Sequence, residues 1–290
     1  MGCSRAFVRR AKLLGADVDL VTSQGVMEFV ANAAEAGRKA IVGNHNLHSI
    51  FLSRKDRRME AFFDQADLIE IDSMPMVYWA RMLGLPTSPA NRCTYLDWRD
   101  EFWAMAAARG WRVFLLGAAK GTADEAALRL TKAWPGVQIA THHGYFDRTP
   151  GSSENQAVVD SINAFEPHVV LVGMGMPIQE MWVAQNAQAL RRGVLLTVGA
   201  AIDYEAGIQG AAPRFLGALC MEWLYRLILD PRRMSSRYLI EPWSLVGPAM
   251  ADLRAYLLGP AAATSTWRPF QDWAVQETQS NSAESLSRAA

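Results

Sequence analysis

A short glycine turn after an apolar stretch is the first feature of this sequence that could bind a ligand. Residues 169–172 are apolar and valine-rich without alternation, which predicts a strand buried on both faces. Gly173 and Gly175 follow, and Pro177 suits the first turn of a helix, where its missing N–H leaves no donor unpaired. Backbone N–H groups and the helix dipole at such a junction favour an anion such as a nucleotide diphosphate. An ordinary tight turn explains the same residues, because short Gly-x-Gly patterns are weak evidence.

Polar side chains follow several of the predicted strands. Gln179 and Glu180 lie in the first turn of the helix after the glycine turn, and Asp203 follows the strand at 194–199. Asp72 directly follows the strand at 68–71, where a carboxylate could act as a general base or bind a ribose hydroxyl. A solvated or helix-capping aspartate is the alternative.

Asn44 and Asn46 follow the strand at 41–43, and their amides could bind sugar hydroxyls or a base. The alternative is turn chemistry, since asparagine tolerates left-handed backbone. No Asp-x-Asp pair follows a strand, so the sequence predicts no metal site.

A basic cluster lies near the C-terminal end. It contains four arginines and one acid, namely Arg226, Arg232, Arg233, Arg237 and Asp230. The guanidinium fork suits phosphate oxygens, and the neighbouring Trp223 and Trp243 suit the headgroup region of an anionic membrane. Ordinary surface salt bridges are the alternative.

The elements that must position these residues alternate between strands and helices. Strands are predicted at 41–43, 68–71, 112–117, 137–140, 169–172 and 194–199, and helices at roughly 24–36, 47–65, 75–84, 99–109, 121–133, 154–165 and 178–191. This alternation predicts an α/β fold with a mostly parallel sheet flanked by helices. Ligands of such sheets bind at the carboxyl ends of the strands, where the polar residues above are found.

The chain divides into three predicted parts. Residues 1–205 form the α/β core, 206–259 a helical appendage, and 260–290 a tail that is mostly disordered because Ala, Ser, Thr, Gln and Asn dominate it. Within the tail, Trp267, Phe270 and Trp273 are spaced three apart and predict one face of a short helix.

Composition excludes several classes of protein. The formal net charge is zero, which argues against a nucleic-acid partner. Three widely spaced cysteines, Cys3, Cys93 and Cys220, form no disulfide framework and fit a reducing cytoplasm. The N-terminus lacks the pattern of a signal peptide, and no apolar run reaches the roughly 20 residues needed to span a bilayer.

Several stretches, in order along the chain, together resemble one family. They are residues 66–74, 113–117, 143–146, 173–180 (GMGMPIQE), 198–207 (VGAAIDYEAG), 212–213 and 222–227, followed by Pro231, Arg233 and Arg237. This set, covering about residues 15–245, resembles the WecG/TagA/CpsF glycosyltransferases, glycosyltransferase family 26.

The resemblance implies an inverting, metal-independent transferase without a cofactor, built on a Rossmann-like core of the GT-E type. Such enzymes move a sugar from a UDP-sugar to a polyprenyl-diphosphate-linked acceptor, as peripheral proteins at the cytoplasmic face of the membrane. The family's catalytic aspartate matches Asp72, and its conserved glutamine matches Gln179. Its other binding residues match Asn44 and Asn46 at strand ends and Arg226, Arg233 and Arg237 in the appendage.

The sequence departs from the family pattern at three motifs. Ser73 stands in place of a glycine, Ile178 in place of a lysine, and Ala211 in place of an arginine. Residues 94–98 (TYLDW), with Met-Pro directly after Asp72-Ser73, resemble the GumM-like exopolysaccharide branch, which implies a UDP-glucose donor. Transfer of N-acetylmannosamine or its uronic acid, within the same family, is the alternative.

Two other classes of protein remain as alternatives. An NAD-dependent oxidoreductase also uses Gly-x-Gly after a strand, but an acid should follow about 20 residues later. That region holds Arg191 and Arg192 instead. An inactive membrane-bound assembly scaffold would not need Asp72 and Gln179.

Overall fold

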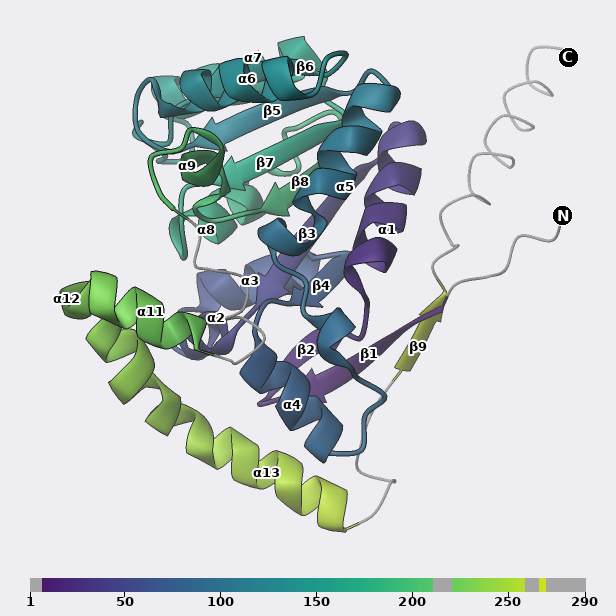
Figure 1. Cartoon of the computed structure of the whole chain (residues 1–290), viewed down its shortest axis with the longest axis vertical. Coiled ribbons are helices and arrows are strands. Elements are labelled where there is room, and N and C mark those ends of the chain that lie inside the picture. The colour runs from purple at the N-terminus through teal and green to yellow at the C-terminus, as the bar shows by residue number, and fades with distance from the viewer. Residues whose placement is uncertain (1–6, 211–220, 259–265, 270–290) are drawn as a thin grey trace, which may run out of the picture.

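A parallel six-stranded sheet forms the centre of the molecule (Figure 1). The computed structural model describes residues 7–210, 221–258 and 266–269. In spatial order the strands are β4 (Leu68–Ile71), β3 (Lys39–His45), β8 (Gly193–Thr197), β7 (Val169–Gly173), β5 (Arg112–Gly117) and β6 (Gln138–His142). All neighbours pair in parallel, so the predicted fold class is confirmed and all carboxyl ends share one edge.

Helices cover both faces of this sheet. One face packs against α1 (Ser23–Glu35), α5 (Tyr95–Ala108), α6 (Thr122–Ala133) and α9 (Ala201–Glu205). The other packs against α3 (Arg57–Gln65), α7 (Ser153–Phe165) and α8 (Ile178–Asn186). Successive strand residues alternate between the two cores, with Val169 and Leu171 in one and Val170 and Val172 in the other. This double burial explains why the strands are apolar without alternation.

The single helix predicted at 47–65 is wrong, because two helices occupy this stretch. The first, α2 (Leu47–Ser53), ends before Asp56, and α3 begins after it. The Asp56 side chain accepts a hydrogen bond from the Arg58 N–H at 2.9 Å and so caps α3.

A small antiparallel sheet lies beside the core and was not predicted. It contains β1 (Phe7–Leu13), β2 (Ala16–Asp19) and β9 (Thr266–Pro269). Its charged sequence hid it, because Arg10 points inward and makes two hydrogen bonds to Asp19, at 2.8 and 2.6 Å. Trp267 lies in β9, so the helix predicted for its segment is wrong at this position. Phe270 and Trp273 lie outside the described residues.

The appendage is helical over residues 222–257, with a break at Asp230. It contains α11 (Glu222–Leu229), α12 (Pro231–Ser235), a π-helical turn η2 (Ser236–Ile240), a 3-10 turn η3 (Glu241–Leu245) and α13 (Val246–Leu257). Figure 1 shows it running past α2 and α4 (Met74–Met82), which both belong to the core. Its Leu245 is buried in a third apolar cluster with Ile50 and Ile71. Farther along, Asp252 accepts hydrogen bonds from the Leu14 N–H and the Trp79 Nε1–H, at 2.7 and 3.0 Å.

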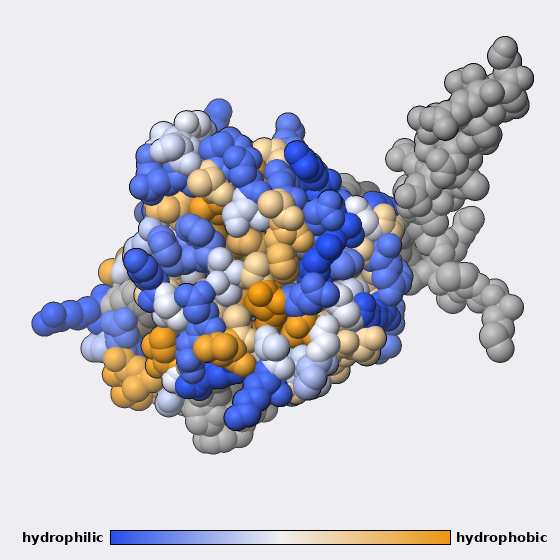
Figure 2. All heavy atoms as spheres, turned by 90° about the horizontal axis from the view of Figure 1, so that it is seen from above, coloured by the Kyte–Doolittle hydropathy of each residue, from blue (hydrophilic) through white to orange (hydrophobic). Residues whose placement is uncertain are grey.

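The outer surface of the core is mixed in character. Viewed from the top of Figure 1, hydrophilic side chains predominate and hydrophobic ones form smaller groups between them (Figure 2). Of the large apolar side chains that are exposed in the described part of the chain, most belong to the appendage.

Close contact between β5 and β7 gives a test of the fold. A Cβ atom on Gly117, the last residue of β5, would lie 2.2 Å from the carbonyl oxygen of Gly173, and Gly117 has φ +152°. We therefore expect Gly117→Ala to lower the free energy of unfolding in urea by about 1–3 kcal/mol. Gly247→Ala is the control, because its Cβ would meet nothing within 4 Å. Equal unfolding midpoints for the wild type and Gly117→Ala would contradict the close packing.

Candidate active site

The carboxylate of Asp72 lies directly after β4 and is held by a neighbouring strand end. Its Oδ2 accepts a hydrogen bond from Asn46 Nδ2 at 3.0 Å. Asn46 in turn caps α2, because its Oδ1 accepts from the Ser49 N–H at 3.0 Å and Ser49 Oγ accepts from the Asn46 N–H at 2.9 Å. The cap therefore fixes the amide that orients Asp72, and the structure brings these two predicted site residues together.

Positive charge from the appendage reaches this carboxylate. Arg237, in η2, is partly buried, and burial lowers its pKa, while the negative charges of Asp72 and Glu241 act in the opposite direction. Arg226, in α11, acts on Arg237 with a like charge, so the two predicted arginines belong to one cluster with Asp72. Arg233 lies in α12, and its side chain lies outside the described residues.

Glu70, two residues before Asp72, is the other carboxyl group at this end of the sheet. Glu70 lies in β4 and is fully buried. Burial, and to a lesser degree the nearby charge of Asp72, raises the pKa of Glu70 well above its ordinary value. This shift favours the neutral acid, whereas Asp72, directly after the strand, is only partly buried.

Gln179 joins the two glycine turns at the ends of β7 and β8. Its Oε1 accepts hydrogen bonds from the Gly175 N–H at 3.2 Å and the Gly199 N–H at 3.1 Å. Its Nε2 donates to Glu180 Oε1 at 2.8 Å. The Gly175 N–H therefore points at Gln179 rather than outward, and Gln179 orders both turns.

Buried polar oxygens line the same edge without a protein partner among the described residues. Asn44 Nδ2 donates to the Thr197 carbonyl at 2.7 Å and so joins β3 to β8, but Asn44 Oδ1 and Thr197 Oγ1 have no partner there. Glu180 Oε2 is likewise unpaired, and burial raises the pKa of Glu180 to about 7. Buried polar atoms normally have partners, so these oxygens suit water or a bound ligand.

The predicted site residues form two groups along one edge. Asp72, Asn46 and Arg237 gather at β4, and Gly173, Gly175, Gln179 and Glu180 gather at β7, with Asn44 between them on β3. Since β4 and β7 are three strands apart, the groups are separated by roughly 14 Å along the sheet. Asp203 lies in α9 after the Gly199 turn, where burial raises its pKa.

The sequence did not indicate two further residues of the site. Thr197 is an ordinary strand residue in the sequence, and Glu241 stands in the appendage more than 160 residues after Asp72. Only the fold brings Glu241 to His48, whose Nδ1 lies 2.5 Å from Glu241 Oε2.

Within residues 7–210, 221–258 and 266–269, no group of three or more His, Cys, Asp or Glu side chains could hold a metal ion. In the same residues, no helix has the length and apolar character needed to cross a membrane. Cys93 is a buried free thiol, while Cys3 and Cys220 lie outside the described residues.

Comparison with known proteins identifies the class to which this fold and site belong, a family of glycosyltransferases. The sequence model of the "Glycosyl transferase WecG/TagA/CpsF family" matches residues 11–256, so the chain belongs to that family. It is similar to the N-acetylglucosaminyldiphosphoundecaprenol N-acetyl-beta-D-mannosaminyltransferases of Staphylococcus aureus strains NCTC 8325 and COL. Each is 29% identical over 234 residues, which cover 79% of this chain and 89% of the relative. The predicted family and the prediction of a glycosyltransferase are confirmed.

The buried acid at the β7 end generates a prediction about pH. Because the pKa of Glu180 rises from 4.5 to about 7 on folding, the folded state keeps a proton that the unfolded state loses between these values. Glu180 therefore lowers the free energy of unfolding as pH rises from about 4.5 to 7. We expect Glu180→Gln to gain stability relative to the wild type between pH 5 and pH 8 in urea titrations. Parallel pH profiles for the two proteins would show that Glu180 titrates normally.

Proposed function

We propose that this enzyme transfers an N-acetylmannosamine-type sugar from a UDP donor to a polyprenyl-diphosphate-linked N-acetylglucosamine, with inversion. The observation that carries the proposal is the Asp72 carboxylate, oriented by Asn46 and within electrostatic reach of Arg237. The names of the staphylococcal relatives support this acetamido-sugar alternative better than the glucose transfer expected for an exopolysaccharide branch.

In this mechanism Asp72 is the general base. The acceptor hydroxyl gives its proton to the Asp72 carboxylate while its oxygen attacks the anomeric carbon from the face opposite UDP. The bond between the anomeric carbon and the UDP oxygen breaks, and its electron pair leaves with UDP. Asn46 contributes by keeping the carboxylate in one orientation, because its own amide is fixed by the cap of α2.

The two groups of residues divide the substrates between them. Arg226 and Arg237 bind the acceptor diphosphate, since guanidinium groups match phosphate oxygens and supply the charge that a metal would otherwise supply. The donor lies along the edge from β3 to β7, with its diphosphate beside the turns at Gly173–Gly175 and Gly199, whose shape is fixed by the hydrogen bonds to Gln179. Asn44, Thr197, Glu180 and Asp203 offer oxygen atoms to its hydroxyl groups.

Replacing the base tests the reaction. Asp72→Asn keeps the size of the side chain and its bond to Asn46 but cannot accept the proton, so we expect turnover to fall by about 10²–10⁴-fold. The measurement is UDP release with UDP-N-acetylmannosamine, UDP-glucose or UDP-N-acetylglucosamine and a short polyprenyl-diphosphate-linked N-acetylglucosamine. UDP affinity should stay within about twofold, because the donor diphosphate binds at the β7 end.

Asp160→Asn provides the matched control, because Asp160 is an exposed carboxylate on α7. Near-normal turnover of Asp72→Asn would remove Asp72 from the role of base. Faster turnover with UDP-glucose than with UDP-N-acetylmannosamine would contradict the proposed donor and support glucose transfer instead.

We further propose that the appendage rests on the anionic inner face of the cytoplasmic membrane, where a polyprenyl-linked acceptor is found. Residues 226–237 carry a net charge of +3, from four arginines and one aspartate. Each basic residue near such a surface contributes about 1 kcal/mol, which gives reversible attachment. Exposed apolar side chains of the appendage add contact, among them Ile228, Leu229, Ile240, Trp243, Leu257 and Leu258.

Binding to lipid vesicles tests this attachment. We expect the full chain to bind vesicles rich in phosphatidylglycerol, to bind neutral vesicles less, and to be released by salt. Trp243→Ser should weaken binding by about tenfold, because a 76% exposed indole no longer enters the interface. Leu128→Ser is the control, since Leu128 is 70% exposed but lies on α6 in the core. Equal binding by both variants would place the membrane contact elsewhere.

A further inference from the structure

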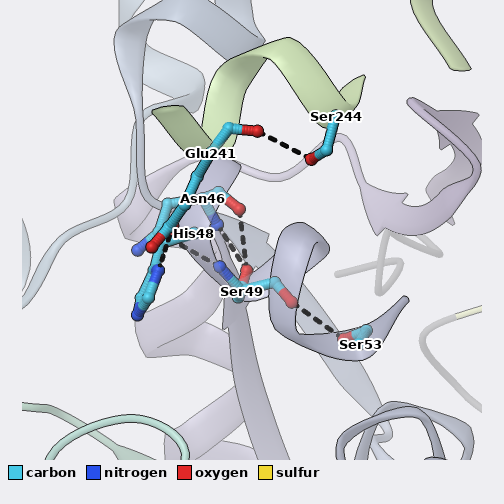
Figure 3. A network of polar contacts seen from close by, with 6 residues as sticks. All are labelled: Asn46, His48, Ser49, Ser53, Glu241 and Ser244. Carbon is cyan, nitrogen blue, oxygen red and sulfur yellow. Dashed lines mark hydrogen bonds and ion pairs between the residues drawn. The ribbon is translucent and has the colours of Figure 1, made fainter. Parts of the chain in front are cut away.

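A buried hydrogen bond ties the appendage to the core beside the candidate base (Figure 3). His48 lies in the first turn of α2, and Glu241 is the first residue of η3. His48 Nδ1 and Glu241 Oε2 are 2.5 Å apart, and the two side chains are only 18% and 10% exposed. The bond therefore joins two segments that are 193 residues apart in the sequence.

The chemistry of this contact is that of a neutral donor and a charged acceptor. Burial lowers the pKa of His48, the positive charge of Arg237 lowers it further, and Glu241 opposes both. A neutral imidazole carrying its hydrogen on Nδ1 donates to the carboxylate. The charge of Glu241 also acts favourably on Arg237, so its carboxylate faces both the core and the arginine.

Both ends of the bond adjoin residues of the site. His48 follows the Asn46 cap by two residues, and Asn46 orients Asp72. Glu241 follows Arg237 by four residues, which is about one helical turn. The bond between His48 and Glu241 therefore links the helix capped by Asn46 to the helical segment that carries Arg237.

The other attachments of the appendage lie farther along the chain. Leu245 packs in the third apolar cluster, and Asp252 binds the Leu14 N–H and the Trp79 Nε1–H. These contacts involve neither His48 nor Glu241, and they attach the end of η3 and α13 to the core.

We propose that His48 and Glu241 are positioning residues that hold Arg237 at the correct distance from Asp72 for the acceptor diphosphate. This role rests on the proposed glycosyl transfer. The His48–Glu241 pair therefore affects the affinity for the lipid-linked acceptor. The donor binds at the β7 end, and its affinity does not depend on the pair.

The test compares variants of the full chain that remove or keep the bond. His48→Leu and Glu241→Leu remove it, and His48→Asn keeps an N–H donor close to the position of Nδ1. We expect each leucine variant to raise the KM for a short polyprenyl-diphosphate-linked N-acetylglucosamine by about tenfold, the cost of one buried bond to a charged group. The affinity for UDP should stay within about twofold, and the double leucine variant should resemble the single variants. His48→Asn should recover most of the acceptor affinity.

Ser244→Ala is the matched control. Ser244 Oγ donates to the Glu241 carbonyl at 2.6 Å within the same turn, and Ser244 is an exposed residue. Its acceptor KM should stay near the wild-type value. An unchanged acceptor KM in the leucine variants, or parallel losses of acceptor and UDP affinity, would overturn the positioning role.

Hydrogen exchange separates this proposal from the reaction itself. Amides of residues 236–245 should exchange faster in both leucine variants than in the wild type, His48→Asn or Ser244→Ala. If the wild type released no UDP with any donor, the proposed reaction would fail, while exchange would still report whether the pair holds the appendage. Unchanged exchange in the leucine variants would overturn the pair as an attachment.

Discussion

The hydrogen bond from Asn46 to Asp72 is the contact on which the arrangement of the site depends. It joins the carboxyl ends of β3 and β4, and it exists because Asn46 is fixed as the cap of α2. The same short helix carries His48, which binds Glu241 of the appendage. One helix of two turns thus sets the orientation of the carboxylate and the approach of Arg237. Because these contacts share α2, a change in its first turn affects both the base and the basic cluster.

The opposite end of the site is built by a different means. Gln179 lies almost fully buried and uses its single carbonyl oxygen to accept from two turns, those of Gly175 and Gly199. Beside it the buried Glu180 keeps one oxygen without a protein partner, which costs folding free energy unless water or a ligand supplies the missing bond. A protein that needed only stability would place an apolar residue there. The retention of these groups is consistent with a site whose polar atoms are completed by the donor.

The sequence predicted the elements whose burial leaves a simple pattern. The central strands at 112–117, 169–172 and 194–197 are almost entirely apolar and buried on both faces, which is the pattern typical of a parallel sheet covered by helices. The β1–β2 hairpin was missed because Arg10, a charged residue, is buried through its pairing with Asp19, and one residue alone does not reveal such a partner. Asp72 was found because it ends a strand. The sequence could not show which residue binds Asp72. Asn46 has the sequence signature of an ordinary helix cap, and only the position of β4 beside β3 brings Asp72 within reach of its amide. The contact between His48 and Glu241 has no local signal at all.

The membrane contact proposed above would use a short stretch, residues 236–246, that also packs against the core. Arg237 is partly buried, and Glu241 and Leu245 are buried against the core. The opposite face presents Leu239, Ile240, Trp243 and Val246 to the outside. The face toward the core thus carries two charged side chains, and the outer face is apolar, the reverse of an ordinary surface helix. In water alone this arrangement would leave apolar area exposed while placing charges in the interior. It becomes favourable when the outer face meets the apolar boundary of a bilayer and the inner charges meet the diphosphate of an acceptor anchored in that bilayer.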